Sequence, residues 1–167
     1  MPVLDQIARC ITPDTFAPFG QMIRATSDGT PYGPDDAQLE LSLGIPRFYL
    51  MRLPYKELII RRITRHRRCT QCLGSLLGQE WFLAVAPPRD LDQSDAVPDL
   101  NEIVTFRIPG TCFVKLHRGT WHAGPYFLAP HMDFYNLELS DTNISDHHTC
   151  NLELHYQTAI RIGIPDL

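Results

Sequence analysis

The residues of this 167-residue chain best suited to chemistry are two histidines and a glutamine at regular spacing. Four residues separate His66 from Gln71, six separate Gln71 from Gly78, and His122 closes the run Gly119-Thr120-Trp121-His122. Histidine can take and give a proton near neutral pH. An amide is a poor ligand for a hard divalent cation but a good hydrogen-bonding partner for an organic acid. The set therefore predicts proton transfer on a small polar molecule.

Turn signals place these residues at the ends of short strands. The segment between His66 and Gln71 is short enough to turn the chain, so both side chains can face one cavity, and Gly78 permits a tight turn after the second strand. Because side chains alternate along a strand, Trp121 and His122 should point to opposite faces. We expect His66, Gln71 and His122 to converge.

Short apolar or β-branched runs, punctuated by Gly, Pro and polar turns, predict an all-β sandwich or barrel. Thr12-Pro13-Asp14 combines an N-cap, a first-turn Pro and an acid, which predicts a helix over residues 13–18. We expect a single domain over residues 1–167, with helix mainly in the N-terminal segment. The expected strands are 21–23, 45–53, 58–65, 71–77, 80–86, 101–108, 111–117, 120–128, 132–139 and 151–164.

Composition narrows the partners and the compartment. The net charge of −4 argues against nucleic-acid binding, and the basic run 61–68 lacks interleaved aromatic residues for base stacking. No window approaches the roughly 20 apolar residues of a membrane span. Five cysteines, an odd number, fit a reducing compartment, so we expect a cytoplasmic protein that binds neither nucleic acid nor membrane.

Two cysteine- and histidine-containing clusters resemble metal sites. Cys69 and Cys72 form a CxxC pair, but they fall on a turn and a strand, so we interpret them as structural. His147, His148 and Cys150 follow a polar loop, and we expect His147 to lie outside the barrel.

Two acids on the expected strand 132–139 are candidate site carboxylates. Asp133 and Glu138 are an odd number of residues apart, so they should face opposite ways. Only one of them can reach a shared site.

The motif spacing resembles the two-part signature of the cupins, in which one motif reads H-x4-E-x6-G and the second ends in G-x2-H. This resemblance implies a cupin-like antiparallel β-barrel of the double-stranded β-helix or jelly-roll type. In cupins the His and Glu side chains surround a metal, whereas here Gln71 replaces the carboxylate. We expect no required cofactor; a weakly bound divalent metal would be held by His66, Gln71 and His122.

The chain also resembles the ureidoglycolate lyase family of the cupin superfamily. The segments that carry this resemblance are 15–20, 65–71, 117–122 and 132–134, of which the HRGTWH run at 117–122 is the most specific. Residues 143–148 look more like the plant and cyanobacterial branch. The resemblance implies cleavage of (S)-ureidoglycolate to glyoxylate and urea, late in purine (allantoin) breakdown, usually by a homodimer.

The substrate implied by the resemblance is a hemiaminal that carries a carboxylate. Its cleavage requires removal of the hydroxyl proton, protonation of the departing urea nitrogen and neutralisation of the carboxylate charge. We assign the base to His122 or His66, and the orientation of the substrate to Gln71. The expected substrate-binding residues are Arg65, Lys115, His117, Arg118, Trp121 and Asp133.

Two other functions stay open. One is a non-catalytic or differently specific cupin that binds a small organic acid or sugar. The other is a metal-dependent cupin oxygenase or isomerase, for which two histidines and an amide fall short of the usual 2-His-1-carboxylate set. The lyase interpretation leads because the HRGTWH resemblance exceeds what the fold alone requires.

Overall fold

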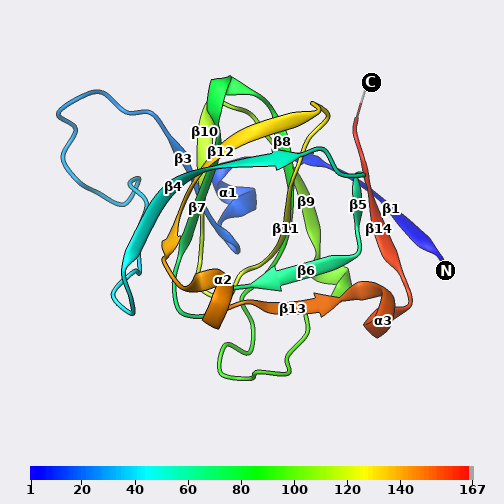
Figure 1. Cartoon of the computed structure of the whole chain (residues 1–167). Coiled ribbons are helices and arrows are strands. Elements are labelled where there is room, and N and C mark those ends of the chain that lie inside the picture. Colours follow the sequence, from blue (N-terminus) through cyan, green and yellow to red (C-terminus); the bar gives the residue numbers. More distant parts are fainter. Residues whose placement is uncertain (166–167) are drawn as a thin grey trace.

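The computed structural model describes residues 1–165, and its strands form three sheets (Figure 1). The five-stranded sheet has the order β3 (Gly20–Arg24), β10 (Cys112–Leu116), β7 (Gln71–Ser75), β12 (His131–Leu139) and β4 (Pro46–Pro54). The six-stranded sheet has the order β13 (His148–Asn151), β6 (Arg62–Arg65), β11 (Trp121–Tyr126), β8 (Trp81–Ala86), β9 (Val104–Ile108) and β2 (Arg9–Cys10). The third sheet contains β1 (Val3–Ile7), β14 (Ala159–Gly163) and β5 (Ile59–Ile60).

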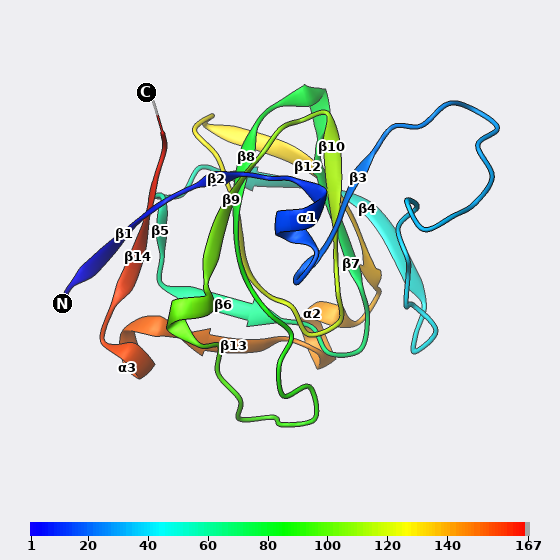
Figure 2. The same ribbon diagram turned by 180° about the vertical axis from the view of Figure 1, so that it is seen from behind.

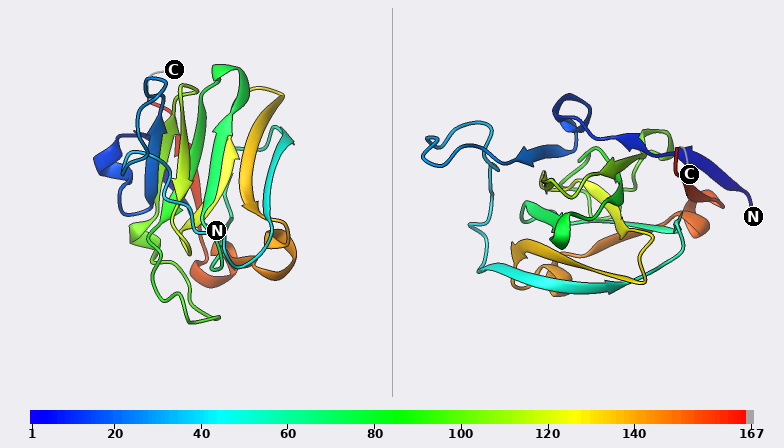
Figure 3. Two further views of the ribbon diagram at one scale, coloured as in Figure 1. Left: turned by 90° about the vertical axis from the view of Figure 1, so that its left-hand side faces the viewer. Right: turned by 90° about the horizontal axis from the view of Figure 1, so that it is seen from above.

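The predicted all-β cupin-like fold is confirmed, as two packed sheets rather than one closed barrel. The long strands β4 and β12 run side by side at one margin of the sandwich (Figure 3), and nine residue pairs from His131–Pro54 to Leu139–Pro46 define their antiparallel register. Most neighbours in the two large sheets are antiparallel, as expected for a jelly roll.

Strand β8 explains how the layers pack. All six of its residues are buried, because Trp81, Leu83 and Val85 face the core between the two large sheets while Phe82, Ala84 and Ala86 face a second core. That second core is closed by the small sheet and the C-terminal segment, through residues such as Ile60 and Ile160. The uninterrupted apolar run of β8 thus reflects burial on both faces.

The predicted N-terminal helix is α1 (Pro13–Phe16). The Thr12 side chain accepts a hydrogen bond from the Thr15 backbone N–H in a capping box. The Phe16 and Phe19 rings pack against Phe106 of β9, and their centroids lie 5.3 and 5.8 Å, respectively, from the Phe106 ring centroid. Figure 2 shows α1 between β9 and β3, where it closes that side of the core.

The prediction that helix is mainly N-terminal is wrong. Helices α2 (Thr142–Ser145) and α3 (Leu152–Tyr156) lie in the C-terminal part, and α3 interrupts the expected strand 151–164. The Asn151 side chain caps α3 by accepting from the Glu153 and Leu154 backbone N–H groups. The short 3₁₀ turns are η1 (Leu76–Gly78) and η2 (Leu100–Glu102).

Within residues 1–165, no helix is long and apolar enough to cross a membrane.

The glycines of the two motifs occupy left-handed backbone positions. Gly78 has φ +67° and Gly119 has φ +78°, a region in which side-chain-bearing residues are strained. The Gly119 N–H donates to the carbonyl of His66 at 2.6 Å. This bond ties the second motif to the first and places β11 beside β6.

Candidate active site

A cavity of about 550 Å³ lies between the five-stranded sheet and the β6–β11 part of the six-stranded sheet. Strands β4, β7 and β12 form one wall, and β6 and β11 form the other. Its polar lining residues include Tyr49, Lys56, Arg61, Arg62, His66, Gln71, His122, Asn136, Glu138, Asn143 and His147. The three motif residues His66, Gln71 and His122 therefore share one cavity, as their spacing predicted.

Backbone carbonyls fix the tautomers of the two motif histidines. His66 Nδ1 lies 2.6 Å from the carbonyl oxygen of Asp146, and His122 Nδ1 lies 3.2 Å from that of Thr120. A carbonyl only accepts, so in each neutral ring Nδ1 carries the proton and Nε2 keeps a lone pair. The ring centroids are 5.0 Å apart. The site thus offers two adjacent proton acceptors.

Burial keeps both rings neutral. Desolvation lowers the pKa of His66, and it lowers the pKa of His122 to about 3, with the neighbouring His66 adding to the effect. The protonated form of either ring is therefore disfavoured.

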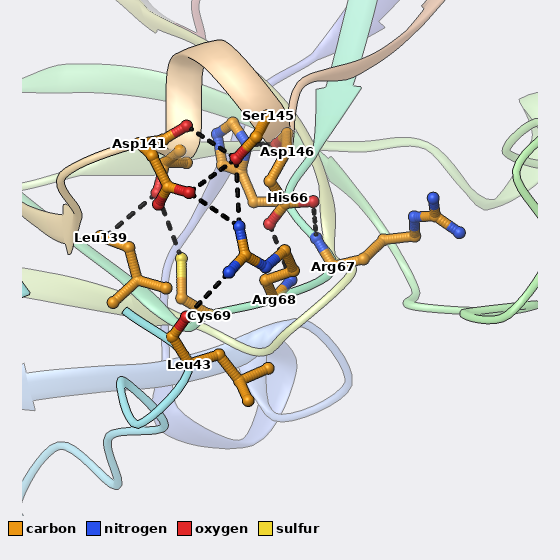
Figure 4. A network of polar contacts seen from close by, with 10 residues as sticks. Leu43, His66, Arg67, Arg68, Cys69, Leu139, Asp141, Ser145 and Asp146 are labelled. Carbon is orange, nitrogen blue, oxygen red and sulfur yellow. Dashed lines mark hydrogen bonds and ion pairs between the residues drawn. The ribbon is translucent and has the colours of Figure 1, made fainter. Parts of the chain in front are cut away.

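A polar network at α2 holds His66 in place (Figure 4). The Asp146 carboxylate accepts from the backbone N–H groups of Arg67 and Arg68 at 2.8 and 2.7 Å, while its carbonyl meets His66. The Arg68 guanidinium donates to Asp141 and Ser145, which belong to the same turn. Helix α2, which the sequence analysis did not anticipate, thereby anchors the first motif.

The amide of Gln71 is held by the strand next to it. Its Nε2 donates to Asn136 Oδ1 and Glu138 Oε2, both at 3.1 Å and both on β12. Its Oε1 is buried and has no hydrogen-bond partner among residues 1–165. Leu73 lines the same cavity, as alternation along β7 predicted.

The acids of β12 face opposite ways, as expected from their odd separation. Glu138 is 1% exposed and lines the cavity, where Tyr49 Oη and Asn143 Nδ2 donate to its Oε1 at 3.2 and 3.0 Å. Asp133 instead pairs with Arg52 on the outer face of the sheet. The structure therefore places Glu138, and not the predicted Asp133, at the site.

His147 lies at the cavity, and its predicted position outside the barrel is wrong. Its ring centroid is 5.8 Å from that of His66, and it lines the cavity. Strand β13 pairs with β6 so that His148 lies opposite Arg65, which brings His147 beside His66. This pairing joins distant segments, so local sequence gave no sign of it.

Arg65 and Trp121 lie on the far side of the six-stranded sheet from the cavity. The fully buried Arg65 guanidinium donates to carbonyl oxygens of Arg89, Asp90 and Gln93 in the loop between β8 and β9, which projects at the bottom of Figure 1. It also lies 4.7 Å from the Trp121 ring centroid. His66 directly follows β6 and His122 lies on β11, and side-chain alternation gives both of them the cavity side. Their neighbours Arg65 and Trp121, which were predicted to bind substrate, therefore face the opposite side of the sheet.

The other predicted binding residues also lie outside the cavity. Lys115 Nζ is 3.0 Å from His117 Nδ1, and His117 Nε2 is 3.1 Å from the carbonyl oxygen of Ala17. Arg118 donates to the carbonyl oxygen of Arg67 and pairs with Glu40. Lys115 alternates with the core-facing Val114 and Leu116 of β10, and this alternation turns it away from the space between the sheets.

Different basic residues line the cavity. Arg61 is paired with Glu57 and Glu153, whereas Arg62 is exposed and forms no ion pair among residues 1–165. The Lys56 side chain is exposed overall, but its ammonium lies 4.2 Å from the Tyr126 ring centroid, and local burial lowers its pKa. The sequence placed these residues in or near a basic run without indicating which would face inward.

The two thiols of the CxxC pair are buried and form no disulfide among residues 1–165. Cys69 Sγ lies 3.5 Å from Thr142 Oγ1, and burial raises the pKa of Cys72 to about 12. Neither thiol lines the cavity.

The fold and the site define a class: a cupin-like protein with a histidine-lined cavity sized for a small molecule. Comparison with known proteins identifies the family within that class. The family model described as ureidoglycolate lyase matches residues 36–162, so the chain belongs to the ureidoglycolate lyase family. It is 27% identical over 161 residues to the ureidoglycolate lyase of Pseudomonas syringae pv. syringae (strain B728a), covering 86% of this chain and 89% of that protein.

Acidification should destabilise the fold through His122. Because its folded pKa of about 3 lies below the unfolded value, the unfolded chain binds more protons below roughly pH 6.5, and stability falls as the pH drops toward 3. We expect His122 alone to account for about 2 kcal/mol between pH 7 and pH 5. Urea unfolding at both pH values measures this loss. It should be smaller in His122→Gln, and an equal loss in that variant would contradict the assignment.

Proposed function

We propose that this protein cleaves ureidoglycolate to glyoxylate and urea. The observation that carries the proposal is a pair of neutral histidines, each with a free Nε2 lone pair, facing one cavity in a member of the ureidoglycolate lyase family. Loss of the hydroxyl proton turns the C–O bond of the hemiaminal into the aldehyde C=O of glyoxylate. The C–N bond then breaks, and the departing nitrogen takes a proton to give urea.

His66 is the better placed of the two bases. A ring with a pKa of about 3 binds a proton weakly, which makes His122 a poor proton acceptor. His66 has its Nδ1–H held by Asp146, so its Nε2 is fixed for proton abstraction. We therefore assign the hydroxyl proton to His66, with His122 packed beside it.

His147 is the candidate acid for the departing nitrogen. It lies beside His66 and is exposed at the cavity, so solvent can restore its proton after each turnover. A base and an acid on neighbouring rings allow the two proton transfers at opposite sides of the breaking bond.

The substrate carboxylate would be neutralised by Arg62 and Lys56. Arg62 brings a guanidinium without an ion-pair partner among the described residues, suited to bidentate carboxylate binding. These two residues replace Arg65, Lys115 and Arg118 in our assignment, since those three lie outside the cavity.

The donors at the cupin metal position do not fit a hard divalent cation. They are two imidazole nitrogens and the Gln71 amide oxygen, and the nearby Glu138 carboxylate is already bound by Tyr49, Asn143 and Gln71. Among residues 1–165, no group of three or more His, Cys, Asp or Glu side chains is arranged to hold a metal. We therefore assign both proton transfers to side chains of the chain itself.

The roles assigned to His66 and His147 predict that replacing either residue lowers turnover. We expect His66→Ala to lower kcat for (S)-ureidoglycolate by about 10²–10⁴-fold, and His147→Ala to lower it in the same direction. His155→Ala, on α3 outside the cavity, is the matched control and should keep wild-type kcat. Coupled assays of glyoxylate and urea release provide the measurement. Binding of glyoxylate by a wild type that shows no turnover would favour the ligand-binding alternative.

Chelation should leave the activity intact, because the proposed proton transfers use side chains only. Dialysis against EDTA, followed by the same assay, is expected to retain more than about half of kcat, since no step depends on a Lewis acid. Loss of activity that Mn²⁺ or Zn²⁺ restores would instead assign a metal to His66, Gln71 and His122.

We also propose a homodimer, formed through the outer face of β4 and β12. Phe48 and Leu50 on this face are 70% and 63% exposed, and they lie opposite Leu137 and Tyr135 in the strand register. The outer face of an antiparallel sheet is usually polar, and a contiguous apolar patch favours a partner surface. The free thiols of the chain fit the cytoplasm, which we propose as its compartment.

Sedimentation velocity tests the proposed dimer. The double variant Phe48→Ser/Leu50→Lys should shift the protein from dimer to monomer, because it places a charge in the apolar patch. Leu154→Lys changes a leucine on α3 that is 82% exposed, more than Leu50, and should leave the dimer unchanged. A monomeric wild type would contradict the proposal.

A further inference from the structure

The buried carboxylate of Glu138 sets the direction of a chain of hydrogen bonds across the cavity wall. A carboxylate accepts only, so the contact of 3.2 Å with Tyr49 requires the Tyr49 hydroxyl to donate. The Tyr49 oxygen is then free to accept from Asn136 Nδ2, which lies 3.0 Å away. The amide of Asn136 is thereby oriented with its oxygen toward Gln71.

The same chain fixes the amide of Gln71. Its two N–H bonds are taken by Asn136 Oδ1 and Glu138 Oε2 at 3.1 Å each. A flipped amide would place Gln71 Oε1 against two acceptors. The chain therefore leaves Gln71 with one role toward the cavity, that of an acceptor.

That acceptor is unsatisfied. Gln71 is 7% exposed, it lines the cavity, and its Oε1 has no hydrogen-bond partner in the part of the chain that the structure describes. A buried polar atom without a partner is destabilising, so a ligand that donates an N–H or O–H to it gains both the bond and relief of that cost. A carboxylate placed there would meet an acceptor and the Glu138 charge behind it.

We propose that Gln71 Oε1 is the specificity-determining acceptor for the terminal NH₂ of the ureido group, and that Glu138 is the residue that positions it. This inference rests on the proposed function. The substrate has three hydrogen-bond donor groups. Its hydroxyl faces the base, and its inner N–H belongs to the nitrogen that the acid protonates. Its terminal NH₂ is left for Gln71. The carboxylate then points toward Lys56 and Arg62, away from Glu138.

The inference also accounts for the loss of the cupin glutamate. A Glu at position 71 would place a second carboxyl group within about 3 Å of Glu138. Two carboxyl groups this close cannot both ionise without a large cost in free energy. It would also remove the two N–H donors that satisfy Asn136 and Glu138. With the carboxylate located on β12, the residue on β7 has to be an amide.

Two inert ligands test the proposal without turnover. N-carbamoylglycine keeps the ureido group and the carboxylate but lacks the hydroxyl, and N-acetylglycine replaces the terminal NH₂ by CH₃. Calorimetry on the wild type should show about tenfold tighter binding of N-carbamoylglycine, the effect of one hydrogen bond to a buried acceptor. Gln71→Met should bind both ligands alike, because it has no acceptor for the terminal NH₂.

The positioning role of Glu138 needs a variant of its own. Glu138→Gln removes the charge that directs the chain, so the preference should fall without disappearing, while Gln79→Met, on an exposed turn, should keep it. The wild-type comparison stands even if a cavity variant fails to fold, as thermal unfolding will show. Equal affinities in the wild type, no binding of either ligand, or a preference that survives in Gln71→Met would overturn the proposal. Failure of the proposed function would appear separately, as absence of ureidoglycolate turnover.

Discussion

Burial of the Glu138 carboxylate between the sheets is the constraint on which the organisation of the cavity depends. A carboxylate removed from water requires donors at both oxygens, and the structure supplies them from three different elements: Tyr49 on β4, Gln71 on β7 and Asn143 on α2. The hydrogen bonds to the Glu138 carboxylate thus hold β4, β7 and α2 together at the cavity wall.

The opposite wall is organised by backbone carbonyls. His66 and His122 each direct Nδ1–H to a backbone carbonyl oxygen, which leaves the Nε2 atom of both rings as an acceptor. One wall therefore presents neutral proton acceptors, while the other presents an oriented amide backed by a negative charge. This division fits a substrate with donors along its length and an anionic end.

The fold was largely predictable because its signals are local. Turn residues separate the strands, alternation assigns faces, and Gly78 forms a turn, as its position predicted, with a left-handed backbone conformation. The convergence of His66, Gln71 and His122 followed from the same rules. Helix α3 was also signalled locally, by Asn151 as a cap, but the apolar residues around it resembled a strand.

The rest of the site depends on contacts between distant segments. His147 reaches the cavity only because β13 pairs with β6, and Tyr49 contacts Glu138 only because β4 pairs with β12. No local periodicity in the sequence indicates either of these strand pairings. The basic residues around His66 show a further limit of sequence-based prediction. Side chains alternate along a strand, so the residue next to a cavity-facing histidine must face away from the cavity. Arg65 was predicted to bind substrate because it is next to His66 in sequence, but this alternation turns it away from the cavity.

Arg65 lies outside the cavity but stabilises the backbone next to it. Its buried guanidinium donates to three carbonyl oxygens of the loop between β8 and β9, and Leu91 of that loop lies where a side chain at Gly119 would be. The loop thus packs on the turn whose N–H binds the His66 carbonyl. A guanidinium directly beside the two rings would disfavour protonation of His66 and His122, whereas on the far face of the sheet Arg65 stabilises the turn that binds the His66 carbonyl. Alternation along β6 therefore gives adjacent residues separate tasks: His66 is available for proton transfer, and Arg65 secures the backbone that positions it.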